Sequence, residues 1–291
     1  MSLATQITFL RRRRSNQPFS AMWLTVILCL LQLPLAHCWM TLDVHTWPVG
    51  KNGHALIEYC YKDHATETKF SQHVEDAIAM WMNALPEDIG VRFVRSTKLC
   101  EEHKDDAPRV HIQNHQNATA ATAGYHGRDV GQQGRHQLWI SDNFGFEYGS
   151  TERTYSNEVV DVAHELGHVL GLNHEHQRPD ATNYIQFNCS YFPGYQDIKQ
   201  RVEEKPIRGL NSIDQICADR VYADAYSWDF GTCILKYPHN TTGLKFSENY
   251  DIDSIMHYRG WSSEVMSVLP EGLFLPPAEI LDTALTAWIV F

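Results

Sequence analysis

Three histidines and one glutamate stand close together in the segment HELGHVLGLNH, which begins at His164. His164 and His168 lie four positions apart where apolar residues recur at helical spacing, so the sequence predicts a helix over about Asn157–Leu170. Residues i and i+4 share one face of a helix, so both imidazoles can point at one metal ion. Gly171 allows a left-handed turn after the helix, and this turn can bring His174 to the same ion. Three nitrogen ligands leave one position open for water, as in catalytic zinc sites.

Glu165 directly follows the first histidine and therefore lies beside the ligand pair rather than in line with it. A carboxylate in this place suits a general base that takes a proton from the attacking water. The pattern HExxH alone arises by chance in roughly one such sequence in twenty. With the later glycine and histidine the frequency falls to on the order of one in several thousand. The sequence therefore predicts one Zn²⁺ per chain, in preference to a solvated helix face rich in histidine.

The pattern HExxHxxGxxH resembles that of the metzincin zinc peptidases, and the continuation HEHQRPD, which ends at Asp180, is similar to the astacin family. A second block, YDIDSIMHY over Tyr250–Tyr258, resembles the Met-turn of the same family. The resemblance extends from Trp47 to Tyr258. It implies an α+β peptidase with two lobes and the zinc cleft between them. The N-terminal lobe holds a mixed twisted sheet with helices, and the C-terminal lobe is mostly irregular and helical.

The resemblance also implies roles for side chains outside the histidine motif. Met256 belongs to the hydrophobic floor beneath the zinc, and Tyr258 stabilises the oxyanion of the transition state. Glu175 matches a family glutamate that secures the mature N-terminus through a buried polar contact, and a solvent-exposed carboxylate is the alternative. Arg178 and Asp180 are expected to form an ion pair behind the site. The implied substrate is a polypeptide.

The N-terminal residues have the layout of a secretory signal. The basic cluster Arg11–Arg14 precedes the apolar run Ala21–Leu31, and the small residue Ala36 follows. The apolar run is short for a membrane span, so an uncleaved membrane anchor is the lesser alternative. We predict a secreted protein with a signal peptide at 1–36, a short pro or linker segment at 37–46, a catalytic domain at 47–258 and a divergent tail at 259–291.

Charge and cysteine content narrow the range of partners and compartments. The net charge of −11 argues against nucleic acid as a partner, and the sequence gives no oligomeric state. Cleavage after Ala36 would leave six of the seven cysteines, an even number that is open to full disulfide pairing. Gly90 stands where the family usually carries a cysteine, so the family's pairing is not assumed. Three glycosylation sequons, at Asn117, Asn188 and Asn240, fit a secreted glycoprotein.

Apolar periodicity predicts the remaining elements. We expect a helix over Phe70–Leu85, a loop over Ala118–Gly134, helices over Gln196–Glu204 and Ser212–Ala223, and strands within 47–61, 91–94, 110–113 and 137–141. By the resemblance, the strand Gln137–Ser141 lies at the edge of the sheet, where an extended substrate can pair with it.

Besides Gly90, two further features depart from the family pattern. The chain between His174 and Tyr258 is longer than usual, which predicts an inserted segment within Pro206–Thr242. The tail after Tyr258 does not match the family and is either a divergent C-terminal piece or a mis-joined reading frame. This tail motivates the second hypothesis, a catalytically inactive binding module. The leading hypothesis is a secreted zinc endopeptidase, and a membrane-tethered peptidase is the third.

Overall fold

The structure is a computed structural model, and it describes residues 40–41, 46–86, 89–105, 107–116, 118–127, 134–142, 156–207, 209–247, 249–258 and 265–269. The predicted signal segment, Cys38, the sequon at Asn117 and the tail beyond Leu269 lie outside these residues. Among the helices that the structure describes, none is long and apolar enough to cross a membrane.

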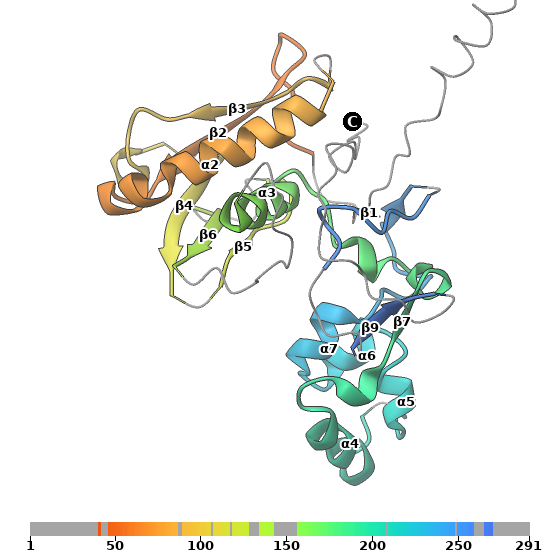
Figure 1. The fold of residues 1–291 in the computed structure, drawn as a ribbon. Coiled ribbons are helices and arrows are strands. Elements are labelled where there is room, and N and C mark those ends of the chain that lie inside the picture. The colour runs from red at the N-terminus through yellow and green to blue at the C-terminus, as the bar shows by residue number, and fades with distance from the viewer. Residues whose placement is uncertain are drawn as a thin grey trace, which may run out of the picture. The chain divides into compact units, whose positions relative to one another are not determined.

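A five-stranded mixed sheet forms the first layer of the N-terminal lobe (Figure 1), with strand order β3-β2-β4-β6-β5. Four strands are mutually parallel: β2 (Ala55–Tyr61), β3 (Val91–Arg95), β4 (Arg109–His115) and β6 (His136–Ser141). The strands predicted at these positions are confirmed. Strand β5 (Ala120–Ala121) runs antiparallel to β6 and lies outside it in the sheet.

Strand β5 corrects two predictions. The stretch Ala118–Gly134, predicted as a loop, contains this short strand. The prediction that Gln137–Ser141 forms the sheet edge is wrong, because Ala120 and Ala121 pair with Trp139 and Leu138. A two-residue strand of alanines carries no alternation of apolar and polar residues, so the sequence offered no periodic signal for it.

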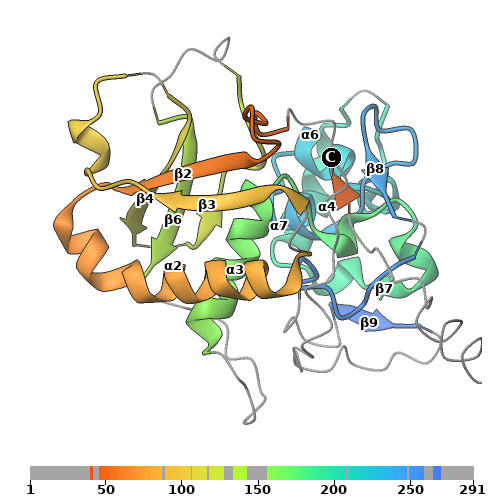
Figure 2. The same cartoon turned by 90° about the horizontal axis from the view of Figure 1, so that it is seen from above.

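Two helices pack side by side against this sheet (Figure 2), namely α2 (His64–Ala84) and α3 (Asn157–Val169). Helix α3 agrees with its prediction to one residue. Helix α2 begins earlier than predicted because the Asp63 side chain accepts a hydrogen bond from Thr66 N and caps the first turn. The two helices and the sheet share one hydrophobic core, which also takes in Ile255 and Met256 from the far end of the chain.

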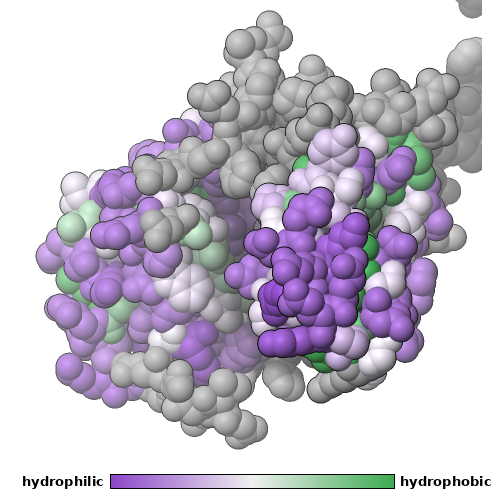
Figure 3. Space-filling view, turned by 90° about the horizontal axis from the view of Figure 1, so that it is seen from below, coloured by the Kyte–Doolittle hydropathy of each residue, from purple (hydrophilic) through white to green (hydrophobic). Residues whose placement is uncertain are grey.

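The C-terminal lobe has a second hydrophobic core built from short helices. These are α4 (Tyr195–Glu204), α5 (Ile213–Ile216), α6 (Arg220–Ala225) and α7 (Asp229–Ile234). Helix α4 was predicted, and its polar outer side chains form the hydrophilic surface nearest the viewer in Figure 3. The prediction of one helix over Ser212–Ala223 is wrong. Ser212 caps α5 and Asp219 caps α6, so the chain stops and starts a new helix between them.

Two pairs of short strands join the predicted linker and the predicted tail to the rest of the fold. Strand β7 (Ile185–Phe187) pairs with β9 (Met266–Val268), and β1 (Met40–Thr41) pairs with β8 (Lys245–Phe246), both antiparallel. The beginning of the predicted tail is therefore part of the folded structure. Within the predicted linker, the Met40 side chain is fully buried. Single 3₁₀ turns occupy Cys100–Glu102, Glu175–Gln177, Ala181–Asn183 and Cys189–Tyr191.

Two disulfides join described cysteines, Cys60 to Cys100 and Cys189 to Cys217. The first ties β2 to the turn that follows β3, and the second ties the turn that follows β7 to the C-cap of α5. Cys233 is not bonded to another described cysteine. Cys38, the sixth cysteine of the predicted set, lies outside the described residues, so the expectation of full pairing stays a prediction.

Candidate metal centre

Three imidazole nitrogens converge at the C-terminal end of α3. His164 and His168 project from the helix, and His174 returns to them after the turn. The Nε2 atom of His174 lies 3.1 Å from Nε2 of His168 and 3.2 Å from Nε2 of His164. Nitrogen ligands held tetrahedrally at 2.0–2.1 Å from zinc stand about 3.3 Å apart, so these spacings fit one Zn²⁺. The structure thus brings together all three predicted ligands.

The second nitrogen of each ring shows which tautomer is present. His164 Nδ1 donates to Ile255 O at 2.7 Å, and His168 Nδ1 donates to Leu172 O at 2.8 Å. His174 Nδ1 donates to the side-chain oxygen of Gln177 at 3.1 Å. Since each acceptor is an oxygen without a proton to give, the proton sits on Nδ1 and the Nε2 lone pair faces the site. None of the three Nε2 lone pairs is used to accept a hydrogen bond, so all three are available to bind zinc.

Burial keeps these imidazoles neutral, which metal binding also requires. Removal from solvent lowers the pKa of His164 to about 3 and lowers the pKa of His168. The pKa of His174 falls well below its usual value for the same reason, helped by the neighbouring histidines. At neutral pH the site therefore presents free nitrogen lone pairs.

The turn between the second and third ligands depends on a glycine. Gly171 has a φ of 100°, in the left-handed region that side chains disfavour. Its N–H donates to His168 O, and Leu172 N donates to Gly167 O, which closes the end of α3. Strand β1 holds this turn from outside, because Thr41 Oγ1 donates to Gly171 O at 2.8 Å.

Met256 lies directly under the zinc helix. A Cβ atom at Gly167 would overlap Met256 Sδ and would stand 3.1 Å from Trp81 Cζ2, so a helix residue without a side chain is required for this close approach. The Met256 carbonyl also accepts the backbone N–H of Glu175 at 3.0 Å. The Met-turn segment is thus fixed to both the helix and the chain after the third ligand.

Glu165 is buried beside the first ligand and accepts a hydrogen bond from the backbone N–H of Ala121 on β5. Burial, with Asp161 nearby, raises the pKa of this carboxyl to about 8. A bound dication would lower this pKa again, because a positive charge favours the carboxylate. The edge strand that the sequence did not reveal therefore contacts the predicted general base.

Tyr258 packs its ring onto the histidines. The Tyr258 ring centroid lies 4.2 Å from that of His174 and 4.5 Å from that of His176. Its backbone N–H donates to His176 Nδ1 at 3.2 Å. Burial raises the pKa of the phenol above its usual value, and the carboxylate of Glu165 acts in the same direction. The hydroxyl is therefore a proton donor at neutral pH.

Glu175 is completely buried, so the alternative of a solvent carboxylate is wrong. Its Oε1 atom accepts from Arg178 Nη1 at 2.8 Å and from Asp251 N at 3.1 Å, while Oε2 has no partner among the described residues. Burial raises the pKa of this carboxyl to about 7, although Arg178 opposes the shift. The predicted ion pair between Arg178 and Asp180 is confirmed at 2.9 Å.

Two residues of the HEHQRPD block had no assigned role in the sequence and prove to contact the site. His176 supports Tyr258, and Gln177 accepts the N–H of His174. Both side chains are buried and their bonds reach residues about sixty positions away, to Cys233 O and Thr232 O. In the sequence, only their position next to the third ligand could have pointed to these residues, because they follow no apolar periodicity.

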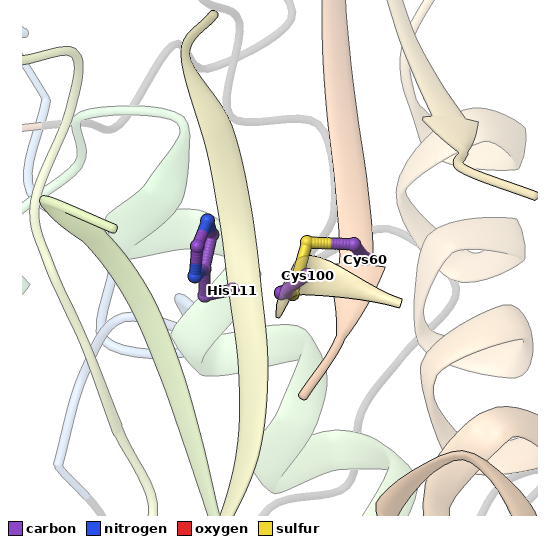
Figure 4. Close-up of side chains that lie close together, drawn as sticks. All are labelled: Cys60, Cys100 and His111. Atoms are coloured by element: carbon purple, nitrogen blue, oxygen red, sulfur yellow. A yellow bond between two sulfur atoms is a disulfide. The ribbon is translucent and has the colours of Figure 1, made fainter. Parts of the chain in front are cut away.

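A second group of metal-ligating types lies at the sheet (Figure 4): Cys60 on β2, His111 on β4 and Cys100 on the 3₁₀ turn after β3. The two sulfur atoms are bonded to each other, so neither can act as a thiolate ligand. The histidine alone does not make a metal site. Among the described residues, the three-histidine cluster remains as the zinc site.

Comparison with known proteins agrees with this chemistry. Residues 46–206, more than half of the 291-residue chain, match the peptidase family Astacin. Among solved structures, the chain is similar to high choriolytic enzyme 1 (HCE-1), a hatching enzyme zinc-protease from Oryzias latipes (Medaka fish), with 19% identity and a TM-score of 0.43 over 78% of this chain and 82% of that one.

The chain is also similar to myroilysin, with 18% identity and a TM-score of 0.45 over 85% of this chain and 96% of that one. No curated protein of matching sequence was found. The family match includes α3 and all three histidines, and it ends at residue 206, where the inserted segment is predicted to begin. The chain therefore belongs to the astacin family of peptidases, whose members are zinc metalloendopeptidases.

Proposed function

We propose that this protein is a secreted endopeptidase that hydrolyses peptide bonds of polypeptides, with Glu165 as general base and Tyr258 as oxyanion donor. The observation that carries the proposal is the convergence of three unprotonated Nε2 atoms beside a buried glutamate on the same helix. When bound by His164, His168 and His174, zinc supplies Lewis acidity toward a water molecule and toward the peptide carbonyl.

Glu165 handles the proton in this mechanism. Its carboxylate takes a proton from the attacking water and delivers it to the departing amine. The backbone N–H of Ala121 holds the carboxylate in place beside the ligands. A bound zinc ion would favour the charged carboxylate, which is the form that accepts a proton. Strand β5 is the sheet edge, which suits the pairing of an extended substrate there.

Tyr258 acts on the oxygen that becomes negative. Its phenol is protonated at neutral pH and can donate a hydrogen bond to that oxygen. His176 Nδ1 accepts the backbone N–H of Tyr258, and the two rings stack. The tyrosine is therefore held in place before the substrate arrives. Such preorganisation is what makes an oxyanion donor effective.

The secreted location and the role of Glu175 belong to the same proposal. Two disulfides among the described cysteines fit an oxidising compartment. The unpartnered Oε2 atom of Glu175 supports the family role of this glutamate, which is to secure the mature N-terminus by a buried contact. The domain boundary at Trp47 stays a prediction, and strand β1 suggests that chains for assay should include Met40.

The test is cleavage of casein or gelatin by the purified protein, expressed with its own N-terminal segment, with and without a chelator. We expect activity that the chelator removes and that added zinc restores. A protein that holds one zinc ion per chain and cleaves neither substrate would favour the inactive binding module. Cell fractionation separates a secreted protein from a membrane-tethered one.

A further inference from the structure

Gln177 occupies an unusual position between the zinc site and the inserted segment, residues 206–242. Its side chain is almost fully buried, with 2% exposed. The Oε1 atom accepts the His174 Nδ1–H at 3.1 Å and also lies 3.1 Å from Arg220 Nη1. The Nε2 atom donates to Thr232 O at 2.9 Å and to Leu235 O at 3.1 Å. Every polar atom of the amide is therefore used.

These partners fix which end of the amide faces the histidine. Two carbonyl oxygens surround one end, and only an NH₂ group can donate to both. The other end faces the Arg220 guanidinium, which only donates, so this end is the oxygen. Since that oxygen cannot donate, His174 must carry its proton on Nδ1 and present Nε2 to the metal.

Apart from His174, the groups that bond the Gln177 amide come from the inserted segment. Thr232 and Leu235 belong to α7 and its C-terminal cap, and Arg220 is the first residue of α6. Tyr237 N donates to the Gln177 carbonyl at 2.7 Å, so the backbone of Gln177 is anchored as well. Arg220 is itself fixed, because its Nη1 atom donates to Tyr237 Oη at 2.7 Å and its guanidinium covers the Tyr237 ring.

We infer that Gln177 is a positioning residue for the third zinc ligand, and that the inserted segment serves to hold Gln177 on His174. The inference rests on the zinc site of the proposed function but does not depend on peptidase activity. Partners of the second nitrogen of a metal-bound histidine typically change metal affinity by about 10- to 100-fold. The inserted segment thereby acquires a role in the affinity for zinc.

Two substitutions at Gln177 separate positioning from ordinary packing. Gln177→Met and Gln177→Glu both remove the N–H groups that bond Thr232 O and Leu235 O, and the loss on that side is at least as large in Gln177→Glu, because its second carboxylate oxygen faces two carbonyl oxygens. Only Gln177→Glu keeps an acceptor for His174, beside Arg220, which balances its charge. We expect Gln177→Met to weaken zinc binding by about 10- to 100-fold and Gln177→Glu to keep the wild-type affinity within a few-fold.

The measurement is the zinc dissociation constant by competition with a chromophoric chelator. Gln200→Met on α4, where the amide is exposed and bonds only Glu204, is the matched control and should leave the constant unchanged. If both Gln177 variants weaken zinc binding equally, or if neither does, the inference is wrong. A wild-type protein that binds no zinc would instead overturn the proposed function, so the two failures are distinguishable.

Arg220→Met provides a second route that leaves the amide and its carbonyl partners intact. Loss of a positive charge alone would strengthen cation binding. Loss of the bond that holds Gln177 Oε1 would weaken it, and we expect several-fold weaker zinc binding. Arg201→Met, which removes an exposed arginine of the same lobe packed on Tyr226, is the control. Tighter or unchanged binding in Arg220→Met would exclude the part assigned to Arg220.

Discussion

The two sides of the zinc site are built by different means. On one side, α3 places two ligands and Glu165 by the geometry of a single helix, within the residues that match the family. On the other side, Met256 and Tyr258 bond residues far away in the chain. Gln177 lies close to His174 in the sequence, but residues far along the chain hold its amide. The bond from His164 Nδ1 to Ile255 O, for example, joins residues 91 positions apart. Local geometry supplies the ligands, and distant segments orient them.

This difference assigns metal binding and transition-state stabilisation to different parts of the chain. Metal binding depends first on the helix, because two of three ligands come from it. In the proposed mechanism, stabilisation of the transition state depends on the second side, where His176 holds the backbone N–H of Tyr258. Substitutions at a ligand, at Glu165 and at Tyr258 should therefore affect metal content and turnover differently, and the expected effects follow in order.

The largest effect is expected from His168→Ala on the helix side. Two remaining imidazoles do not make a stable zinc site, so this variant should contain no zinc and show no cleavage. Elemental analysis of the purified protein checks the first part. Full zinc occupancy in the variant would remove the site as described.

Glu165→Gln should separate chemistry from metal binding on the same helix. The amide is nearly isosteric and keeps the ligands in place, but it cannot take a proton from water. We expect zinc content equal to wild type and a loss of several orders of magnitude in kcat. A variant that cleaves casein at close to the wild-type rate would contradict the role of general base.

Tyr258→Phe tests the second side. The ring and its packing on His174 and His176 remain, so the fold and the zinc content should be unchanged. Loss of one oxyanion donor typically lowers kcat by about 10²–10³, or roughly 3–4 kcal/mol, with KM nearly constant. If KM rises while kcat is unchanged, Tyr258 contacts the substrate or has a packing role and is not an oxyanion donor. The proposed difference between the two sides would then not hold.

The helix side was also the side that the sequence predicted well. Helix α3 and its ligands follow from spacing alone, since i and i+4 share a face and glycine permits the turn. The four parallel strands followed from apolar runs in the same way. Strand β5 did not, because its two alanines have no periodicity and take their place from pairing with β6.

The second side could be predicted only through resemblance, and incompletely. The segment SIMHY pointed to Met256 and Tyr258. Nothing local showed that the side chains of His176 and Gln177 would be buried and would bond backbone carbonyls of residues 232 and 233. The break between α5 and α6 was likewise missed, because Asp219 as a cap outweighed the continuous helical pattern. Residues that form hydrogen bonds over a long distance along the chain have no characteristic spacing in the sequence, so these contacts could not be predicted from it.

Gly167→Ala probes the point where the two sides touch. The new methyl group would overlap Met256 Sδ and press on Trp81, which typically costs about 1–3 kcal/mol, while better helix propensity returns about 1 kcal/mol. We expect a net loss of about 1 kcal/mol in the free energy of unfolding. Combining it with Met256→Ala should reveal a coupling energy above about 0.5 kcal/mol, measured by chemical denaturation. Strictly additive effects would mean that the two sides do not share this contact.

The last effect concerns pH and His176, the residue that holds Tyr258. Burial lowers the pKa of His176 well below its usual value, and both ring nitrogens are engaged, Nδ1 as acceptor from Tyr258 N and Nε2 as donor to Cys233 O. The unfolded chain titrates this imidazole near its ordinary pKa of about 6.5. Below that pH the unfolded state binds a proton that the folded state does not, so stability present above it is lost as pH falls.

His176→Asn keeps an acceptor near the position of Nδ1 but cannot take up a proton. It should therefore be less stable than wild type at neutral pH, because the bond to Cys233 O and the stacking on Tyr258 are lost. Below about pH 6.5 the wild-type protein alone loses stability through this residue, by up to about 1.4 kcal/mol per pH unit. The gap between the two proteins should consequently narrow toward acid, as measured by denaturant unfolding of chelator-treated protein. A gap of constant size from about pH 7.5 to about pH 5 would mean that folding does not keep this imidazole neutral, and that the support of Tyr258 is less buried than the geometry indicates.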